Sequence, residues 1–144
     1  MLGLLGASPV ASADFTARGL KIGHPWTRPA AIGGTGAGYL SIANTGKAAD
    51  ALIGVETTAA KSAGVHRSAM AGEVMTMRPV TALAIAPGQT VTLQPGGDHI
   101  MMVGLTRALS QGEKIPVTLV FQKAGRIQIA LLVEKTGPGV RRGQ

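Results

Sequence analysis

The chain has 144 residues, 14 Lys and Arg against 7 Asp and Glu, a formal net charge of +7 and no cysteine. This length fits one domain that folds without disulfides, and the lack of cysteine excludes disulfides, thiolate zinc sites, catalytic thiols and blue-copper sites. One Trp, one Tyr and two Phe are too few for a base-stacking platform, so the charge indicates a solvated surface or an acidic protein partner rather than nucleic acid.

The first 13 residues, MLGLLGASPVASA, have the pattern of the back half of a secretory signal. An apolar stretch from Leu2 to Val10 precedes the small-x-small triplet Ala11-Ser12-Ala13, but the basic region that opens such a signal is missing. We expect 1–13 to be a signal remnant and the protein to be exported to a Gram-negative periplasm, and an apolar N-terminus without that role is the alternative. No later run of 18 uncharged apolar residues predicts a membrane span.

From residue 14 to 136 we expect a single domain built of β-strands, followed by a flexible basic tail at 137–144. Short apolar runs are separated by Gly, Pro, Asn and Asp, and no helical pattern extends beyond one turn at Ala59–Ala63. About nine strands at this spacing favour an all-β sandwich or barrel. The predicted strands are Leu20–Ile22, Ala37–Ala43, Ala51–Thr57, Val65–Ser68, Val74–Val80, Thr90–Gln94, His99–Leu105, Val117–Gln122 and Ile127–Val133.

Nothing in the sequence indicates an enzyme. The seven carboxylates are scattered, and neither a Ser-x-x-Lys nor a Gly-x-Ser-x-Gly motif is present. We therefore look for binding chemistry rather than turnover.

Histidine and methionine are concentrated in one part of the chain. Five of the six methionines lie between Met70 and Met102, and His66 and His99 lie in or beside the same window. Methionine is usually a gap-filler in cores, but scattered core residues would not be expected to gather in this way. The clustering points to a shared site.

The spacing of these residues predicts two local pairs. A two-residue turn at Ala71-Gly72, or a four-residue loop over 70–73, would place His66 directly opposite Met77, with Cβ atoms about 4.5–5.5 Å apart. His99 and Met101 are two residues apart on a strand, so they project from the same face. Met102 projects from the other face and is expected in the core.

This donor set favours a soft, monovalent metal ion. Two neutral imidazoles and two neutral thioethers suit Cu(I), whereas zinc rarely recruits methionine. Met75 shares a face with Met77 and is expected to shield the site, with direct ligation by Met75 or Met70 as the alternative. His24 has no methionine near it and no expected metal role, and Trp26 is expected in the core. The basic residues near these segments are either solvated or dock an acidic acceptor: Arg67, Arg78 and Arg107.

The spacing His66-x10-Met77-x21-His99-x-Met101 resembles the signature of the PCuAC-type periplasmic copper(I) chaperones. The similarity extends over about residues 20–133, through the segments HPWTRPA, GYLSIANTGKAADALIG, MTMRPV, PGGDHIMMVGL and PVTLVFQKAG. It implies a cupredoxin-like (immunoglobulin-like) β-sandwich that holds Cu(I) near its surface. It also implies delivery to the copper A centre of cytochrome c oxidase, together with Sco-type proteins.

Two departures from the family pattern matter. Many relatives carry a methionine just after the first histidine, where this chain has Arg67 and Ser68. Some have a His- and Met-rich C-terminal extension linked to Cu(II), but the tail here contains neither residue, so no second site is expected there. Copper storage or resistance, and a metal-free envelope module that binds another protein, remain the alternative functions.

Overall fold

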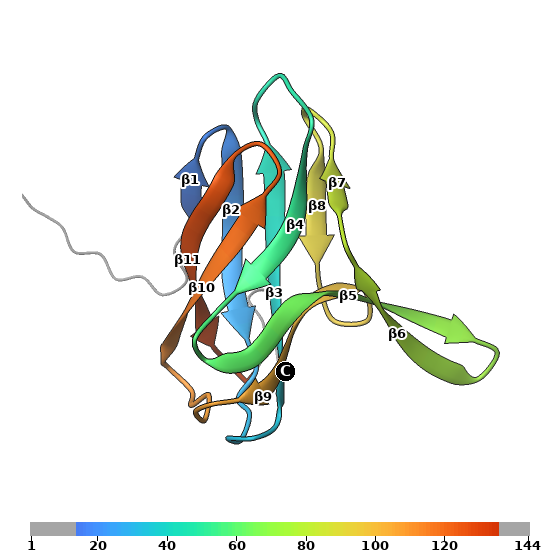
Figure 1. Cartoon of the computed structure of the whole chain (residues 1–144), viewed down its shortest axis with the longest axis vertical. Coiled ribbons are helices and arrows are strands. Elements are labelled where there is room, and N and C mark those ends of the chain that lie inside the picture. The colour runs from blue at the N-terminus through green and yellow to red at the C-terminus, as the bar shows by residue number, and fades with distance from the viewer. Residues whose placement is uncertain (1–13, 136–144) are drawn as a thin grey trace, which may run out of the picture.

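The computed structural model describes residues 14–135, which form eleven β-strands and no helix (Figure 1). No helix in this part of the chain is therefore long and apolar enough to cross a membrane. The expected signal remnant and basic tail lie outside the described residues and stay predictions. The strands are β1 (Phe15–Ala17), β2 (Leu20–Thr27), β3 (Thr35–Asn44), β4 (Asp50–Glu56), β5 (Ala60–Ala71), β6 (Val74–Val80), β7 (Leu83–Ile85), β8 (Thr90–Leu93), β9 (Asp98–Leu105), β10 (Lys114–Phe121) and β11 (Gly125–Val133).

All nine predicted strands are present, so the all-β prediction is confirmed. The structure adds two strands of three residues each, β1 and β7, which are too short for an alternating pattern to reveal. The sequence allowed one helical turn at most at Ala59–Ala63, and none forms there: β5 begins at Ala60 and extends three residues beyond the predicted strand, as far as Ala71.

Strand pairing follows the order β6-β5-β9-β3-β2-β11-β10-β4-β7, with β1 added to β2 and β8 added to β3. The sheet curls so that β4 comes to lie against β5 and β7 near β3, which leaves a core between two layers. Alternate side chains point inward, most regularly on β11, where Ile127, Ile129, Leu131 and Val133 are all buried. No disulfide joins the two layers, because the chain has no cysteine. The burial of apolar side chains between them stabilises the core.

The β5–β6 hairpin projects away from this body (Figure 1). Its two strands pair from Val65↔Val80 to Ala71↔Val74, so the two-residue turn is Gly72-Glu73. Residues 69–79 are all exposed, and the hairpin is held to the molecule mainly where β5 pairs with β9.

The predicted register of this hairpin is wrong by two residues. His66 lies opposite Pro79, and Met77 lies opposite Ser68. The reason is the turn: two-residue hairpin turns need a positive φ at their first central position, which glycine adopts readily, and Gly72 has φ +67°. A turn at Ala71-Gly72 would place alanine there. Because the shift is an even number, Met77 still projects from the same face as His66.

Candidate metal site

The four predicted ligands lie on one face of three adjacent strands. β5 runs between β6 and β9, and His66 of β5 is directly opposite His99 of β9. Met101 is opposite Gly64 on the next step of β5, and Met77 of β6 is the diagonal neighbour of His66. Directly opposed residues share a face and diagonal neighbours lie within reach of long side chains, so the sheet brings all four donors to one patch.

The two imidazoles are close enough to share one ion. Their ring centroids are 6.4 Å apart and their planes differ by 25°. A metal–imidazole bond is about 2.0–2.1 Å and a ring nitrogen lies about 1.1 Å from the centroid, so two rings on one ion are at most about 6.4 Å apart. The pair is at the outer edge of that range, which is reached only when the two bonds are collinear, so a four-donor ion would need the two rings to move closer together.

His99 is held in the tautomer that a ligand needs. Its side chain is buried, at 4% exposure, and its Nδ1 lies 2.9 Å from the carbonyl oxygen of Gly97. A carbonyl can only accept a hydrogen bond, so Nδ1 carries the proton and Nε2 keeps its lone pair. Metal-binding histidines are commonly oriented by a backbone carbonyl in this way.

His66 has a buried nitrogen that no described residue satisfies. Its Nδ1 is shielded from solvent and has no hydrogen-bond partner within residues 14–135. An unsatisfied buried polar atom costs about 1–3 kcal/mol, so natural sequences rarely retain one without a role. A ligated metal ion would remove that cost.

The two thioethers differ in how firmly they are held. Met101 is half-buried on β9, between β5 and β3, whereas Met77 is 49% exposed on the projecting hairpin. Met77 and Met101 line one groove together with His99, Met75 and Tyr39. An ion in this groove would be held by the donors on the sandwich and covered by the exposed side chain of Met77.

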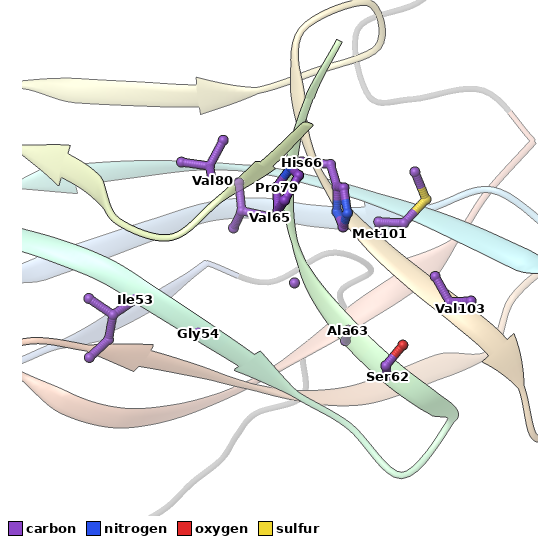
Figure 2. A pocket seen from close by; sticks show the side chains of 11 residues that line it. Ile53, Gly54, Ser62, Ala63, Val65, His66, Pro79, Val80, Met101 and Val103 are labelled. Atoms are coloured by element: carbon purple, nitrogen blue, oxygen red, sulfur yellow. The ribbon is translucent and has the colours of Figure 1, made fainter. Parts of the chain in front are cut away.

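His66 and Met101 also line a second groove, on the side facing β4 (Figure 2). Its walls are apolar and include Ile53 of β4, Val80 and Val103. Gly64 lies opposite Met101, and a Cβ built on it would meet no atom within 4 Å. The space beside Gly64 is therefore open on this side of the groove.

A bidentate ion pair reinforces the pairing of β5 with β9. Arg67 donates to both carboxylate oxygens of Asp98, at 2.8 and 3.0 Å, and the two residues directly follow His66 and precede His99. The Arg67 guanidinium holds the pKa of Asp98 below its usual value, although partial burial acts in the other direction. The pair lies on the opposite face of the sheet from the imidazoles, so the carboxylate does not compete for the ion.

His24 and Arg107 lie apart from the four donors, whereas Arg67 and Arg78 directly follow His66 and Met77 in the chain. His24 is in the irregular part of β2, where its N–H donates to Asp14, and it lines neither groove. Arg107 pairs with Glu113 and Arg67 with Asp98, so two of the three arginines proposed for docking already have partners, while Arg78 is exposed.

The aromatic residues lie next to the groove. Trp26 is buried, as predicted, and packs on Tyr39 with ring centroids 4.8 Å apart. The Arg28 guanidinium lies 5.7 Å from the Tyr39 ring and 5.9 Å from the Trp26 ring, a cation–π arrangement. Of this cluster, Tyr39 lines the groove that contains the two thioethers.

The donor atoms of this patch include the soft thioether sulfurs of two methionines. Within residues 14–135 no group of three or more His, Cys, Asp or Glu side chains could hold a metal ion, which leaves out the usual zinc, calcium and magnesium sites. The thioethers of Met77 and Met101 beside the two imidazoles are soft donors, and soft donors favour Cu(I). The donor set therefore fits copper.

Three contributors to the site were not predicted from the sequence: Gly64, the carbonyl of Gly97 and Tyr39. Gly64 and Tyr39 reach the site through strand pairing between distant segments, β5 with β9 and β3 with β9, whereas the Gly97 carbonyl contacts the His99 ring from two residues along the chain. The doubled glycine before His99 was a signal for a turn, but it did not reveal which carbonyl would face the imidazole.

Comparison with known proteins assigns the domain to a protein family. Residues 20–133 match the family model "Putative lipoprotein LpqE-like". The chain is 33% identical over 119 residues to "Putative lipoprotein Lxx21020" of Leifsonia xyli subsp. xyli, which covers 82% of this chain and 71% of that protein.

Solved structures agree with this assignment. The copper-bound PCuAC domain from PmoF2 is 30% identical with a TM-score of 0.74, over 86% of this chain and 99% of that one. The apo PCuAC domain from PmoF1 is 29% identical with a TM-score of 0.73, over 86% and 100%. The Cu(I) form of DR1885 from Deinococcus radiodurans is 30% identical with a TM-score of 0.59, over 79% and 78%. The chain therefore belongs to the LpqE-like family, which is the PCuAC family, and has its cupredoxin-like β fold.

Proposed function

We propose that this protein is an exported Cu(I) metallochaperone that binds one ion with His66, Met77, His99 and Met101. The observation that carries the proposal is the convergence of two imidazoles and two thioethers on one face of β6, β5 and β9. The copper named in the structures of the PmoF2 domain and of DR1885 supports the choice of metal. The lipoprotein names of the family and of the Leifsonia relative support export, and the periplasm is the compartment we propose.

The donor set suits a carrier better than a permanent cofactor site. Four neutral ligands leave the positive charge of the ion uncompensated, so a thiolate or other anionic acceptor can compete for it. Met77 is the most exposed of the four and belongs to the projecting hairpin. It is the ligand that an acceptor would displace first, while His99 and Met101 still hold the ion.

The acceptor we propose is the copper A centre during assembly of cytochrome c oxidase, with a Sco-type protein as partner. The support is family resemblance together with the chemistry of a thiolate acceptor, to which copper would move downhill from thioethers and imidazoles. The protein acts without turnover of a substrate, since it exchanges ligands around an ion and changes no covalent bond of its own.

Removing both imidazoles tests the binding site. In competition with a chromophoric Cu(I) chelator, His66→Ala/His99→Ala should bind Cu(I) more than about 100-fold more weakly, because even loss of an outer-shell partner costs about 10–100-fold. The matched control is His24→Asn, which removes the third histidine at a left-handed position that asparagine tolerates. Unchanged affinity in the double variant would rule out the proposed ligand set.

Replacing sulfur without changing volume separates a copper carrier from a metal-free interaction module. Met77→Leu should lose most of its Cu(I) affinity, whereas Met102→Leu should keep it, because Met102 is fully buried on the opposite face of β9. Both variants should fold, since such swaps cost less than about 1.5 kcal/mol. The measurements are chelator competition and urea unfolding of the apo-protein. Equal Cu(I) affinity in the two variants would favour the interaction module.

Delivery is tested by transfer to an acceptor. The Cu(I)-loaded protein is mixed with the reduced, metal-free soluble domain that carries a copper A site, and the two are separated and analysed for copper. We expect copper on the acceptor, because its thiolates are stronger Cu(I) ligands than thioethers. Copper that stays on this protein, while the same acceptor loads from a small Cu(I) complex, would point to storage instead.

A further inference from the structure

The outer part of the β5–β6 hairpin carries apolar side chains that have no core to fill. Four large apolar residues there are exposed, and three of them are methionines: Met70, Val74, Met75 and Met77. Methionine normally fills gaps in a packed interior, but every described residue from 69 to 79 is exposed. Core packing therefore does not explain the three methionines on the outer part of the β5–β6 hairpin.

Two of these methionines face each other. Met70 of β5 is directly opposite Met75 of β6, so their Cβ atoms are about 4.5–5.5 Å apart on one face. The side chains are flexible and 59% and 55% exposed. Two thioether sulfurs can thus meet on one ion without any change in the backbone.

This pair lies on the same face as the four donors described above. Along β5 the face carries His66, Ser68 and Met70, and along β6 it carries Pro79, Met77 and Met75. Met75 also lines the groove that contains Met77, His99 and Met101. Met70 is four residues from His66, about 13 Å along the strand, which is too far for one ion and close enough for a neighbouring site.

We propose that Met70 and Met75 form a second, weaker Cu(I) site, through which copper enters and leaves the site of His66, Met77, His99 and Met101. The direction of transfer rests on the proposed function, but binding at the second site does not. Two thioethers hold the ion less firmly than four donors do. Met77 belongs to the first site and lies two residues from Met75 on the same face of β6, so its sulfur can bond the ion before Met70 or Met75 lets go. The copper stays monovalent and no proton moves, because thioethers do not titrate.

An apolar patch at the end of an arm could also dock a protein partner. Leucine distinguishes the two roles, because Met→Leu keeps the apolar surface and removes the sulfur. If the pair binds a soft ion, leucine at these positions abolishes binding, whereas a docking surface would tolerate the change.

The test uses the full chain with ¹³C-methyl-labelled methionine and Ag(I), a redox-stable probe for Cu(I) sites. Free N-acetylmethionine in the same tube reports how a lone thioether responds. We expect the methyl signals of Met77 and Met101 to shift with the first equivalent, and those of Met70 and Met75 to shift with the second, before the reference does. In Met70→Leu/Met75→Leu the second equivalent should bind more than about 100-fold more weakly, because the loss of an outer-shell partner alone costs about 10–100-fold. The control is Val74→Ala, on the opposite face of the hairpin, which should bind both equivalents as the parent does.

The outcomes separate this inference from the proposed function. If Met70 and Met75 shift only together with N-acetylmethionine while Met77 and Met101 respond first, the second site does not exist and the proposed function stands. If Met70 and Met75 still bind in His66→Ala/His99→Ala, the second site is independent of the first. If the leucine double variant keeps its second equivalent, the inference is overturned.

Discussion

The pairing register of β5 between its two neighbours is the constraint on which the proposed site depends. It places His66 opposite His99, Met101 opposite Gly64 and Met77 on the same face. A slip of one residue at either border would turn one set of donors to the other side of the sheet. Gly72 fixes the register on the β6 side through its positive φ, and the Arg67–Asp98 pair reinforces it on the β9 side.

The same arrangement explains how one site can both hold and release an ion. His99 and Met101 belong to a strand paired on both sides, and His99 is oriented by the carbonyl of Gly97. Met77 belongs to a hairpin that has no layer packed over it among the described residues. In the proposed function, the donors on the sandwich therefore supply the affinity, and Met77 on the projecting hairpin allows the ion to be exchanged. Holding all four donors on rigid strands would favour a permanent metal centre instead.

Much of the fold follows from local pattern, because strands at core positions alternate apolar and polar residues and are separated by turn residues. β11 was located in this way to within two residues at its ends. The three-residue strands β1 and β7 could not be found, since a segment that short has no measurable period. The outer end of β5, residues 69–71, was missed because it is exposed and carries no alternation of apolar and polar residues.

The candidate site was predictable as a set of residues but not as a geometry. The soft donors and their spacing name His66, Met77, His99 and Met101 before any coordinates are known. The contacts between the donors of β5 and β9 arise from pairing between segments more than 30 residues apart, which local propensity does not encode. The direct opposition of the two histidines is such a contact. The predicted register of the β5–β6 hairpin was wrong for a local reason. Glycine is favoured at the first position of the turn, and this preference outweighs the symmetric spacing of His66 and Met77 about the predicted turn.

Copper K-edge X-ray absorption on the protein loaded with one equivalent of Cu(I) tests the ligand set most directly. The convergence of the four side chains predicts an edge typical of Cu(I) and a first shell of two nitrogen and two sulfur scatterers, with the outer-shell pattern of imidazole. A first shell of nitrogen and oxygen alone, or of sulfur without imidazole, would contradict the account.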